Sequence, residues 1–256
     1  MTYIFYFHIK TMDFDVAMKN KSGAIKPKTT SDSTLVIYTQ DHWLRLQKIR
    51  KKSTELMGKL TAQNIQPIIY GSVCRGDVSE SSDIDLFIPY QISSFKLELA
   101  LQQEGYDIYG KKIVQATPKH LVKAHILLSE DITITFPLTS IREREFEFIQ
   151  FGGSFGYNDL LQNKRVPGVD KRLILIEPIT EGHKESQIIG YESIVAKKVG
   201  VSVELVRERI RILTTRDKVG RTGVYLDMNL ASEENIDEVF KQVKDNDPIV
   251  RRRAQK

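Results

Sequence analysis

The sequence contains little cysteine and no long apolar run, and each absence excludes a class of protein. One cysteine among 256 residues cannot form an internal disulfide, and no Cys/His cluster has the spacing of zinc ligands. No stretch reaches the ~18 to 20 apolar residues that a membrane-spanning helix needs. The apolar opening, Tyr3 to Ile9, lacks the basic start and the small-residue cleavage site of a signal peptide. We therefore expect a protein of the reducing cytoplasm with no membrane partner.

The net charge is small, but the basic residues are unevenly distributed along a chain whose length suits two domains. Lys and Arg number 38 against 33 Asp and Glu, which gives +5. The segment 197–221 alone holds eight Lys and Arg against three acidic residues, a surplus equal to that of the whole chain. Contact with nucleic-acid phosphates requires such a local surplus, but a solvated helix with internal ion pairs has the same charge. Charge alone leaves both interpretations open.

The first 150 residues divide into an arm and a domain. Residues 1–33 are expected to be a flexible arm, because Met12 to Ser33 is rich in Lys, Thr and Ser and offers few apolar side chains for a core. Beyond it, apolar spacing predicts helices over 41–62 and 94–103 and strands over 68–70, 84–88, 113–116, 125–128 and 132–137. This alternation predicts an α+β domain over 34–150, with a mixed sheet and flanking helices.

The remaining residues predict a second, smaller unit. Glycine- and proline-bearing stretches make 151–180 a candidate connection. Helical patterns over 191–199 and 202–213 are separated by a tight turn at Gly200, and Ser202 is a suitable N-cap. Two glycines then permit a hairpin between Val219 and Leu226. Residues 181–256 therefore resemble a small, mainly helical winged helix-turn-helix domain with a basic tail.

The segment 71–88 carries the most specific chemical pattern, and it begins with a glycine-serine turn. A buried strand ends at Gly71, whose missing side chain lets a ligand approach the backbone. Ser72 begins a turn or short helix whose free N–H groups suit phosphate oxygens. Arg75 adds a fixed positive fork, and Gly76 keeps the following turn open. These four residues are the candidate nucleotide-binding set.

Two aspartates complete the pattern at the start of the next strand. Asp83 and Asp85 are two residues apart, so their side chains project from one face of that strand. Two carboxylates so close repel each other unless a cation lies between them. Oxygen ligands of this kind suit Mg²⁺, or Mn²⁺, bound together with substrate phosphates. Asp83 and Asp85 are therefore the candidate metal ligands.

This pattern resembles the signature of the DNA polymerase β-like nucleotidyltransferase superfamily: Gly71-Ser72, then Arg75-Gly76, then Asp83-x-Asp85. The resemblance covers about 18 of the 256 residues. It implies a nucleotidyltransferase-like sheet and transfer of a nucleoside monophosphate from a nucleoside triphosphate to a hydroxyl, with release of pyrophosphate. It also implies that the glycine-serine turn holds the triphosphate and that the two aspartates bind the metal ions.

Active members of that superfamily usually carry a third carboxylate on a neighbouring strand. The matching strand here is 132–137, where alternation places Thr133 and Thr135 at the centre of the relevant face and Asp131 at its edge. A threonine hydroxyl is no base near neutral pH. Either Asp131 reaches into the site and completes a catalytic set, or the domain binds nucleotide without turnover and the protein is a DNA-binding regulator. Both hypotheses stay open.

The C-terminal basic segment supplies candidate contacts to DNA or RNA. Arg207, Arg209 and Arg211 cannot all face one groove, because helical residues two apart lie on different sides. We select Arg207 and Arg211 on the second helix, with Lys218 and Arg221 in or near the hairpin, as nucleic-acid contacts. A purely structural helical unit is the alternative.

Two further residues have plain explanations. Cys74 lies inside the glycine-serine segment but has no identifiable base partner, so an incidental small side chain is expected. His183 lies between charged residues and is expected to be solvated. Neither is assigned a role.

Overall fold

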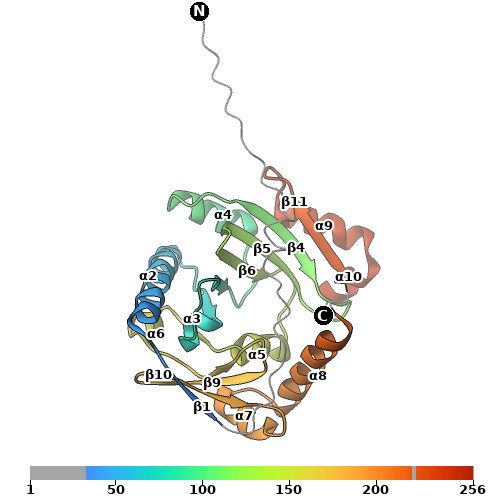
Figure 1. Ribbon diagram of the computed structural model, residues 1–256. Helices are drawn as coiled ribbons and strands as arrows, with labels where there is room; N and C mark the ends of the chain where they lie inside the picture. The colour runs from blue at the N-terminus through green and yellow to red at the C-terminus, as the bar shows by residue number, and fades with distance from the viewer. Residues whose placement is uncertain (1–32, 221–222, 256) are drawn as a thin grey trace, which may run out of the picture.

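The computed structural model describes residues 33–220 and 223–255 and has a mixed α+β architecture built on two sheets (Figure 1). The strands are β1 (Thr34–Ile37), β2 (Ile68–Tyr70), β3 (Ile84–Phe87), β4 (Gly110–Gln115), β5 (Val122–Ser129), β6 (Ile132–Pro137), β7 (Ser154–Gly156), β8 (Gly168–Val169), β9 (Ile174–Ile179), β10 (Gly182–Gln187) and β11 (Leu226–Leu230). The helices are α2 (Gln40–Ala62), α3 (Ser72–Arg75), α4 (Ser94–Gln103), α5 (Glu143–Phe151), α6 (Tyr157–Leu161), α7 (Glu192–Val199), α8 (Val203–Val219), α9 (Ile236–Asn246) and α10 (Pro248–Ala254).

The larger sheet has seven strands in the order β11-β4-β5-β6-β3-β2-β7. Its neighbours are antiparallel except β3 and β6, which run parallel with Asp85 opposite Thr133. The parallel pair brings the start of β3 beside the start of β6, and Ile84 N donates to Asp131 O at 2.7 Å. Because β2 and β3 are antiparallel, the chain that leaves β2 at Gly71 and the chain that enters β3 at Ile84 lie at the same end of these two strands.

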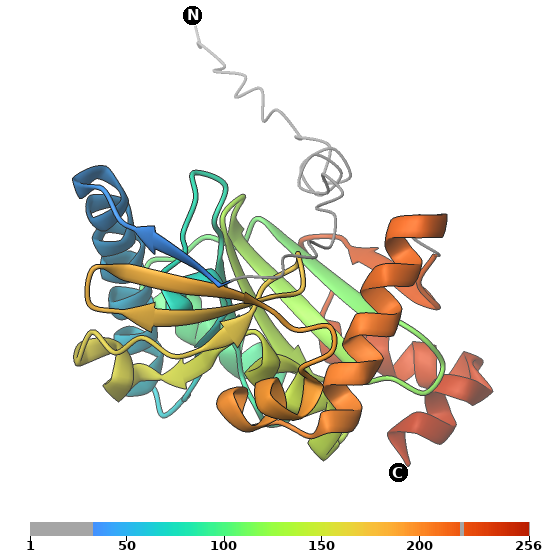
Figure 2. The same ribbon diagram turned by 60° about the horizontal axis from the view of Figure 1, so that its bottom comes forward.

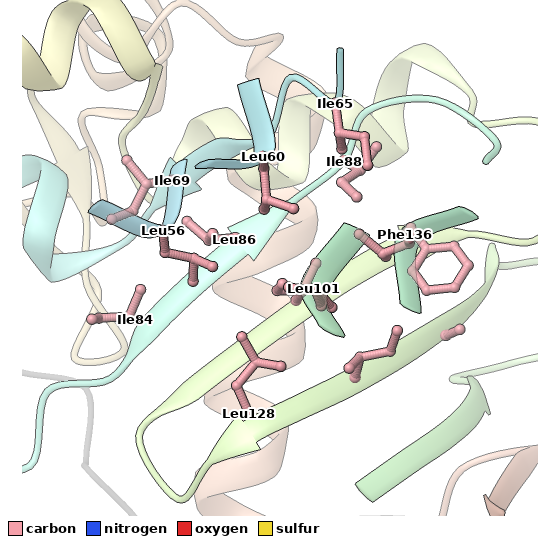
Figure 3. Packing of buried hydrophobic residues seen from close by; sticks show 14 of the residues in the cluster. Leu56, Leu60, Ile65, Ile69, Ile84, Leu86, Ile88, Leu101, Leu128 and Phe136 are labelled. Atoms are coloured by element: carbon pink, nitrogen blue, oxygen red, sulfur yellow. The ribbon is translucent and has the colours of Figure 1, made fainter. Parts of the chain in front are cut away.

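One face of this sheet is apolar and is covered by α2, α4 and α9. Figure 3 shows Ile84, Leu86 and Leu128 from the strands against Leu56 and Leu60 of α2, and all belong to the main hydrophobic cluster. Because side chains alternate along a strand, Asp85 projects to the opposite face, and Asp83 immediately precedes β3. The core thus fixes the orientation of the candidate site residues.

The smaller sheet has four antiparallel strands in the order β1-β10-β9-β8. Beside it, α7 and α8 pack on a second hydrophobic cluster that includes Val169, Leu175, Val195 and Leu205. Figures 1 and 2 place α7 next to this sheet, and α8 runs from α7 toward β4 and β11. The turn between the two helices is as predicted: Gly200 adopts a left-handed conformation with φ of 72°, and the Ser202 side chain accepts from Leu205 N at 3.3 Å.

The C-terminal residues are not arranged as the predicted separate unit. β11 extends the large sheet by pairing with β4, with Met228 opposite Ile113. Helices α9 and α10 contribute Phe240 and Val250 to the main hydrophobic cluster. The candidate connection, 151–180, is also built into the fold, because β7 pairs with β2 and the α6 residue Leu160 lies in the same cluster. Residues 226–254 thus share the core of the 34–150 region, whereas α7 and α8 pack on the second cluster.

The predicted helices over 41–62 and 94–103 are confirmed, as are the strands over 68–70, 84–88 and 132–137, within a residue at each end. The strands predicted over 113–116 and 125–128 are parts of the longer β4 and β5, displaced or extended by up to three residues. The arm 1–32 lies outside the described residues. Within the described ranges, no helix combines the length and the apolar character that crossing a bilayer requires.

Candidate functional site

The glycine-serine turn joins β2 to α3 and has an unusual backbone. Gly71 adopts φ of 91° and ψ of −149°, a conformation that L side chains rarely take. A Cβ atom built on Gly71 would meet no other atom within 4 Å, so the space beside it is open. The N–H groups of Ser72 and Val73 are the first two of the helix and therefore have no intrahelical acceptor. The turn offers both room and donors for an oxyanion.

A hydrogen bond connects this turn to the aspartate segment. Ser72 Oγ donates to Ser82 Oγ at 3.1 Å, and Ser82 immediately precedes Asp83. On the neighbouring ladder, Tyr70 lies directly opposite Asp85. Gly71, Ser72, Asp83 and Asp85 are thus brought together from two strands that are antiparallel neighbours.

Arg75 has a different role from the one predicted. Its side chain is buried, with Nε and Nη2 donating to the two carboxylate oxygens of Asp77 at 2.9 Å and Nη1 donating to Gly152 O at 2.6 Å. A guanidinium held this way fastens α3 to the chain after α5 and does not extend to a nucleotide. The expected contact of Arg75 with phosphate is therefore corrected to a positioning role.

Gly76 is also a packing position. It is left-handed, with φ of 102°, and its carbonyl lies 2.7 Å from His42 Nε2. A Cβ atom there would lie 2.8 Å from Arg165 Cδ. The glycine therefore permits close packing behind α3, and the predicted nucleotide contact through Gly76 finds no geometric support. Of the four predicted nucleotide-binding residues, Gly71 and Ser72 are the two that lie at the open space beside the turn.

Asp131 lies at the start of β6, but its carboxylate is bound by other groups. Ser129 Oγ donates to Oδ1 at 2.5 Å, and Lys52 Nζ of α2 lies 3.3 Å from Oδ2. Burial raises the pKa of Asp131, but the Ser129 hydrogen bond and the Lys52 charge outweigh it, so the pKa lies below its usual value. Among the described residues, no three His, Cys, Asp or Glu side chains are grouped to hold a metal ion.

The donor set of Asp83 and Asp85 nevertheless fits one cation shared with a substrate. Mg²⁺ is commonly held by one or two protein carboxylates, with phosphate oxygens and water completing its shell. The two aspartates supply carboxylates from one face of β3, and the open space at Gly71 lies next to them through the Ser72–Ser82 contact. This chemistry suits a metal ion that arrives with a polyphosphate.

The same face continues into a polar cluster that the sequence analysis missed. His125 of β5 hydrogen-bonds Thr135 of β6, with 2.8 Å between His125 Nδ1 and Thr135 Oγ1, and Tyr70 of β2 lies on the same sheet face. Lys123 lies two residues before His125 on the same face of β5. Polar residues at alternate positions of an apolar strand were the available signal, because Lys123 and His125 alternate with the buried Val122, Ala124 and Ile126.

Burial dominates the electrostatics of this cluster. It raises the pKa of Tyr70, assisted by the negative charge of Asp85. It lowers the pKa of His125 well below 6.5, and the charges of Lys123 and Lys112 act in the same direction. Burial also lowers the pKa of Lys123, against the influence of Asp85. The His125 imidazole is therefore neutral at pH 7, beside a carboxylate group and a lysine group.

The predicted nucleic-acid contacts on α8 share one side of the helix. Arg207, Arg211 and Lys218 are exposed, and their spacing of four and seven residues places them in one stripe. Arg209 lies on another side, 4.6 Å over the ring of Phe148. Arg221 falls outside the described residues. The hairpin expected around it is not formed by β11, which pairs with β4 instead.

Cys74 and His183 are both buried. The Cys74 thiol donates to Ile69 O at 3.0 Å, and burial raises its pKa, so it is an unreactive core residue as expected. His183 was expected to be solvated, but it lies in β10 with Nδ1 2.7 Å from the Tyr38 hydroxyl. This contact holds the link between β1 and α2 against β10.

Comparisons with protein family models, with curated proteins and with solved structures found no match to this chain. The functional argument therefore rests on the geometry of the residues themselves.

Proposed function

We propose that the protein is a nucleotidyltransferase that depends on Mg²⁺ or Mn²⁺ and transfers a nucleoside monophosphate from a nucleoside triphosphate to a hydroxyl of nucleic acid. The proposal includes a nucleotidyltransferase-like fold for the large sheet and its helices. One observation carries it: the Ser72–Ser82 hydrogen bond joins the glycine-serine turn to the segment that leads through Asp83 into β3, which bears Asp85. Groups suited to polyphosphate and to a divalent cation thus meet on one sheet face.

Each group of residues would have its own role, which follows from its chemistry. The open backbone of Gly71 and the first N–H groups of α3 would bind the triphosphate. Asp83 and Asp85 would hold the cation, which when bound supplies positive charge to the phosphate oxygens. Arg75 and Asp77 keep α3 in place, so that its amides stay aligned with the aspartates. The residues of the protein would mainly position the substrates and neutralise the phosphate charge, as phosphoryl transfer requires.

The test is transfer of label from α-labelled nucleoside triphosphates, with Mg²⁺, to a panel of RNA and DNA strands. Asp83→Asn should abolish incorporation, since it removes a carboxylate without changing side-chain volume. Glu80→Gln is the matched control, because Glu80 is on the same loop with its side chain 91% exposed and only a 3.4 Å contact to Arg45. Incorporation that survives Asp83→Asn would contradict the proposal.

A second candidate function is favoured by the contacts of Asp131. Its carboxylate is occupied by Lys52 and Ser129, which suits a domain that binds nucleotide without transferring it. In that case the protein would be a DNA-binding regulator. Its helix-turn-helix would consist of α7 and α8, with the exposed stripe of Arg207, Arg211 and Lys218. Nucleotide binding with no transfer to any strand of the panel would favour this candidate over the enzyme.

A further inference from the structure

Lys123, His125 and Lys112 form a group on the same sheet face as Asp85, which we call the basic pole. Lys123 and His125 alternate along β5 with residues of the core, and Lys112 of β4 lies directly opposite His125. The Lys112 ammonium pairs with Asp227 of β11 at 2.5 Å. The basic pole therefore spans the two strands that lie beyond β6 from the aspartates.

Lys123 differs from the other buried lysines of the sheet. Lys111 lies 3.3 Å from Glu98, and Lys112 has Asp227, but the Lys123 ammonium forms no ion pair or hydrogen bond with any residue that the structure describes. Burial lowers its pKa, and the negative charge of Asp85 acts in the opposite direction. An anionic ligand at this half-buried ammonium would favour its charged form.

The order of the strands separates the basic pole from the triphosphate end of the site. The Gly71–Ser72 turn follows β2, the aspartates are on β3, and the basic pole lies past β6 on β5 and β4. In phosphoryl transfer the attacking and leaving oxygens lie roughly in line. If pyrophosphate departs on the β2 side, the acceptor hydroxyl arrives from the β6 and β5 side, where Lys123 lies.

We propose that Lys123, flanked by His125 and Lys112, binds a backbone phosphate of the acceptor strand and thereby places its hydroxyl opposite the triphosphate. This inference rests on the proposed function and names its acceptor class, a single-stranded nucleic-acid end. The His125 imidazole is neutral, so it can stand beside two lysines and contact the same strand without adding repulsion. The phosphate would supply the negative charge that Lys123 lacks.

Fluorescence anisotropy of labelled oligouridylate and oligothymidylate tests this without turnover, using the full chain. Lys123→Gln should weaken binding about tenfold or more and reduce the slope of log affinity against log salt by about 0.7, the value for one contact with a single strand. Lys96→Gln, at an exposed position of α4, is the control and should change neither quantity. Lys123→Arg should retain most of the affinity, because it keeps the charge.

Calorimetric titration with Mg²⁺ and each nucleoside triphosphate distinguishes the source of the phosphate. Triphosphate affinity should stay within about twofold in Lys123→Gln. Reduced triphosphate affinity with unchanged oligonucleotide affinity would overturn the inference, because Lys123 would then contact the donor. Unchanged affinity for both ligands would overturn it as well.

A wild-type measurement covers the case in which Lys123→Gln fails to fold. Amine-selective acylation, read by mass spectrometry, should be slowed at Lys123 by bound oligonucleotide but not by triphosphate, whereas Lys96 should react equally in all samples. Equal acylation of Lys123 with and without oligonucleotide would refute the contact. Absence of transfer activity with Lys123 protected would instead count against the proposed reaction alone.

Discussion

The Nδ1 atom of His125 lies 2.8 Å from the Oγ1 atom of Thr135, at the centre of the sheet face that carries Asp85. This contact connects β5 and β6 through polar side chains, and Tyr70 of β2 lies on the same face. An ordered polar network is stabilising only when its members are satisfied. This face of the sheet is therefore partly buried, and it also carries the smaller hydrophobic cluster of Phe87, Leu121 and Ile149.

His125 makes stability depend on pH in a defined window. Its pKa is lowered by burial and by Lys123 and Lys112, while the unfolded chain has a value of about 6.5. Below that value the unfolded state binds a proton that the folded state does not, so stability falls as the pH drops from about 6.5 toward the folded pKa.

Urea unfolding at pH 7.5 and 5.5 measures this effect. His183 has a lowered pKa too and adds to the loss in the wild type. His125→Asn should remove the share of His125, at most about 1.4 kcal/mol per pH unit for one proton. His120→Asn, at an exposed position, is the control for the substitution itself. Identical pH profiles for His125→Asn and the wild type would contradict the assignment.

Arg75 should matter for stability more than for nucleotide affinity. Arg75→Ala leaves Asp77, whose side chain is 12% exposed, without its partner. Breaking a buried pair on one side costs about 3 to 5 kcal/mol. Chemical denaturation should show a loss of this size, whereas Arg45→Ala, which removes only an exposed pair with Glu80, should cost less than about 1 kcal/mol. A stable Arg75→Ala protein with reduced triphosphate affinity would support the direct phosphate contact instead.

Gly71→Ala tests two properties of the turn: the backbone conformation at residue 71 and the open space beside it. The substitution places an L side chain at φ of 91°, which costs about 1 to 3 kcal/mol, although its Cβ meets no neighbour. Because the methyl group enters the open space at the turn, triphosphate affinity should fall as well. Gly156→Ala is matched, since its Cβ also has open space but its φ is −91°. Equal stability and affinity in the two variants would be inconsistent with a ligand-binding turn.

The exposed stripe of α8 should contribute to nucleic-acid binding if the helix-turn-helix contacts DNA. Replacing both Arg207 and Arg211 with Gln should lower affinity for duplex DNA and reduce the salt slope by about 2, near 0.9 for each phosphate contact. Lys241→Gln, exposed on α9, is the charge control. Unaltered affinity in the double variant would identify the stripe as a solvated helix face.

Local patterns predicted the parts of the fold that depend on neighbouring residues. The helix 40–62 follows from apolar spacing and a polar N-terminal boundary, and its observed cap is Thr39, which accepts from His42 N at 3.3 Å. The glycine-serine turn and the two aspartates were accessible because their residues are close in sequence and their spacing is characteristic. Their proximity in space follows from the antiparallel pairing of β2 and β3.

Long-range partners could not be read from the sequence. The pairing of β11 with β4 joins segments more than 100 residues apart, and a local pattern does not specify which strand an edge accepts. Arg253 belongs to the predicted basic tail but is buried, with Nη2 2.8 Å from Glu145 Oε2. Lys123 and His125 were visible as polar alternation, but only the sheet order shows that their face is the face of Asp85.

The most direct test of the central claim is calorimetric titration of nucleoside triphosphate into the full chain, with and without Mg²⁺. The account predicts binding that requires the cation, is lost in Asp83→Asn and in Asp85→Asn, and is retained in Glu80→Gln. Affinity that is the same with and without Mg²⁺, or that both aspartate variants preserve, would contradict a site in which the glycine-serine turn and the two carboxylates act together.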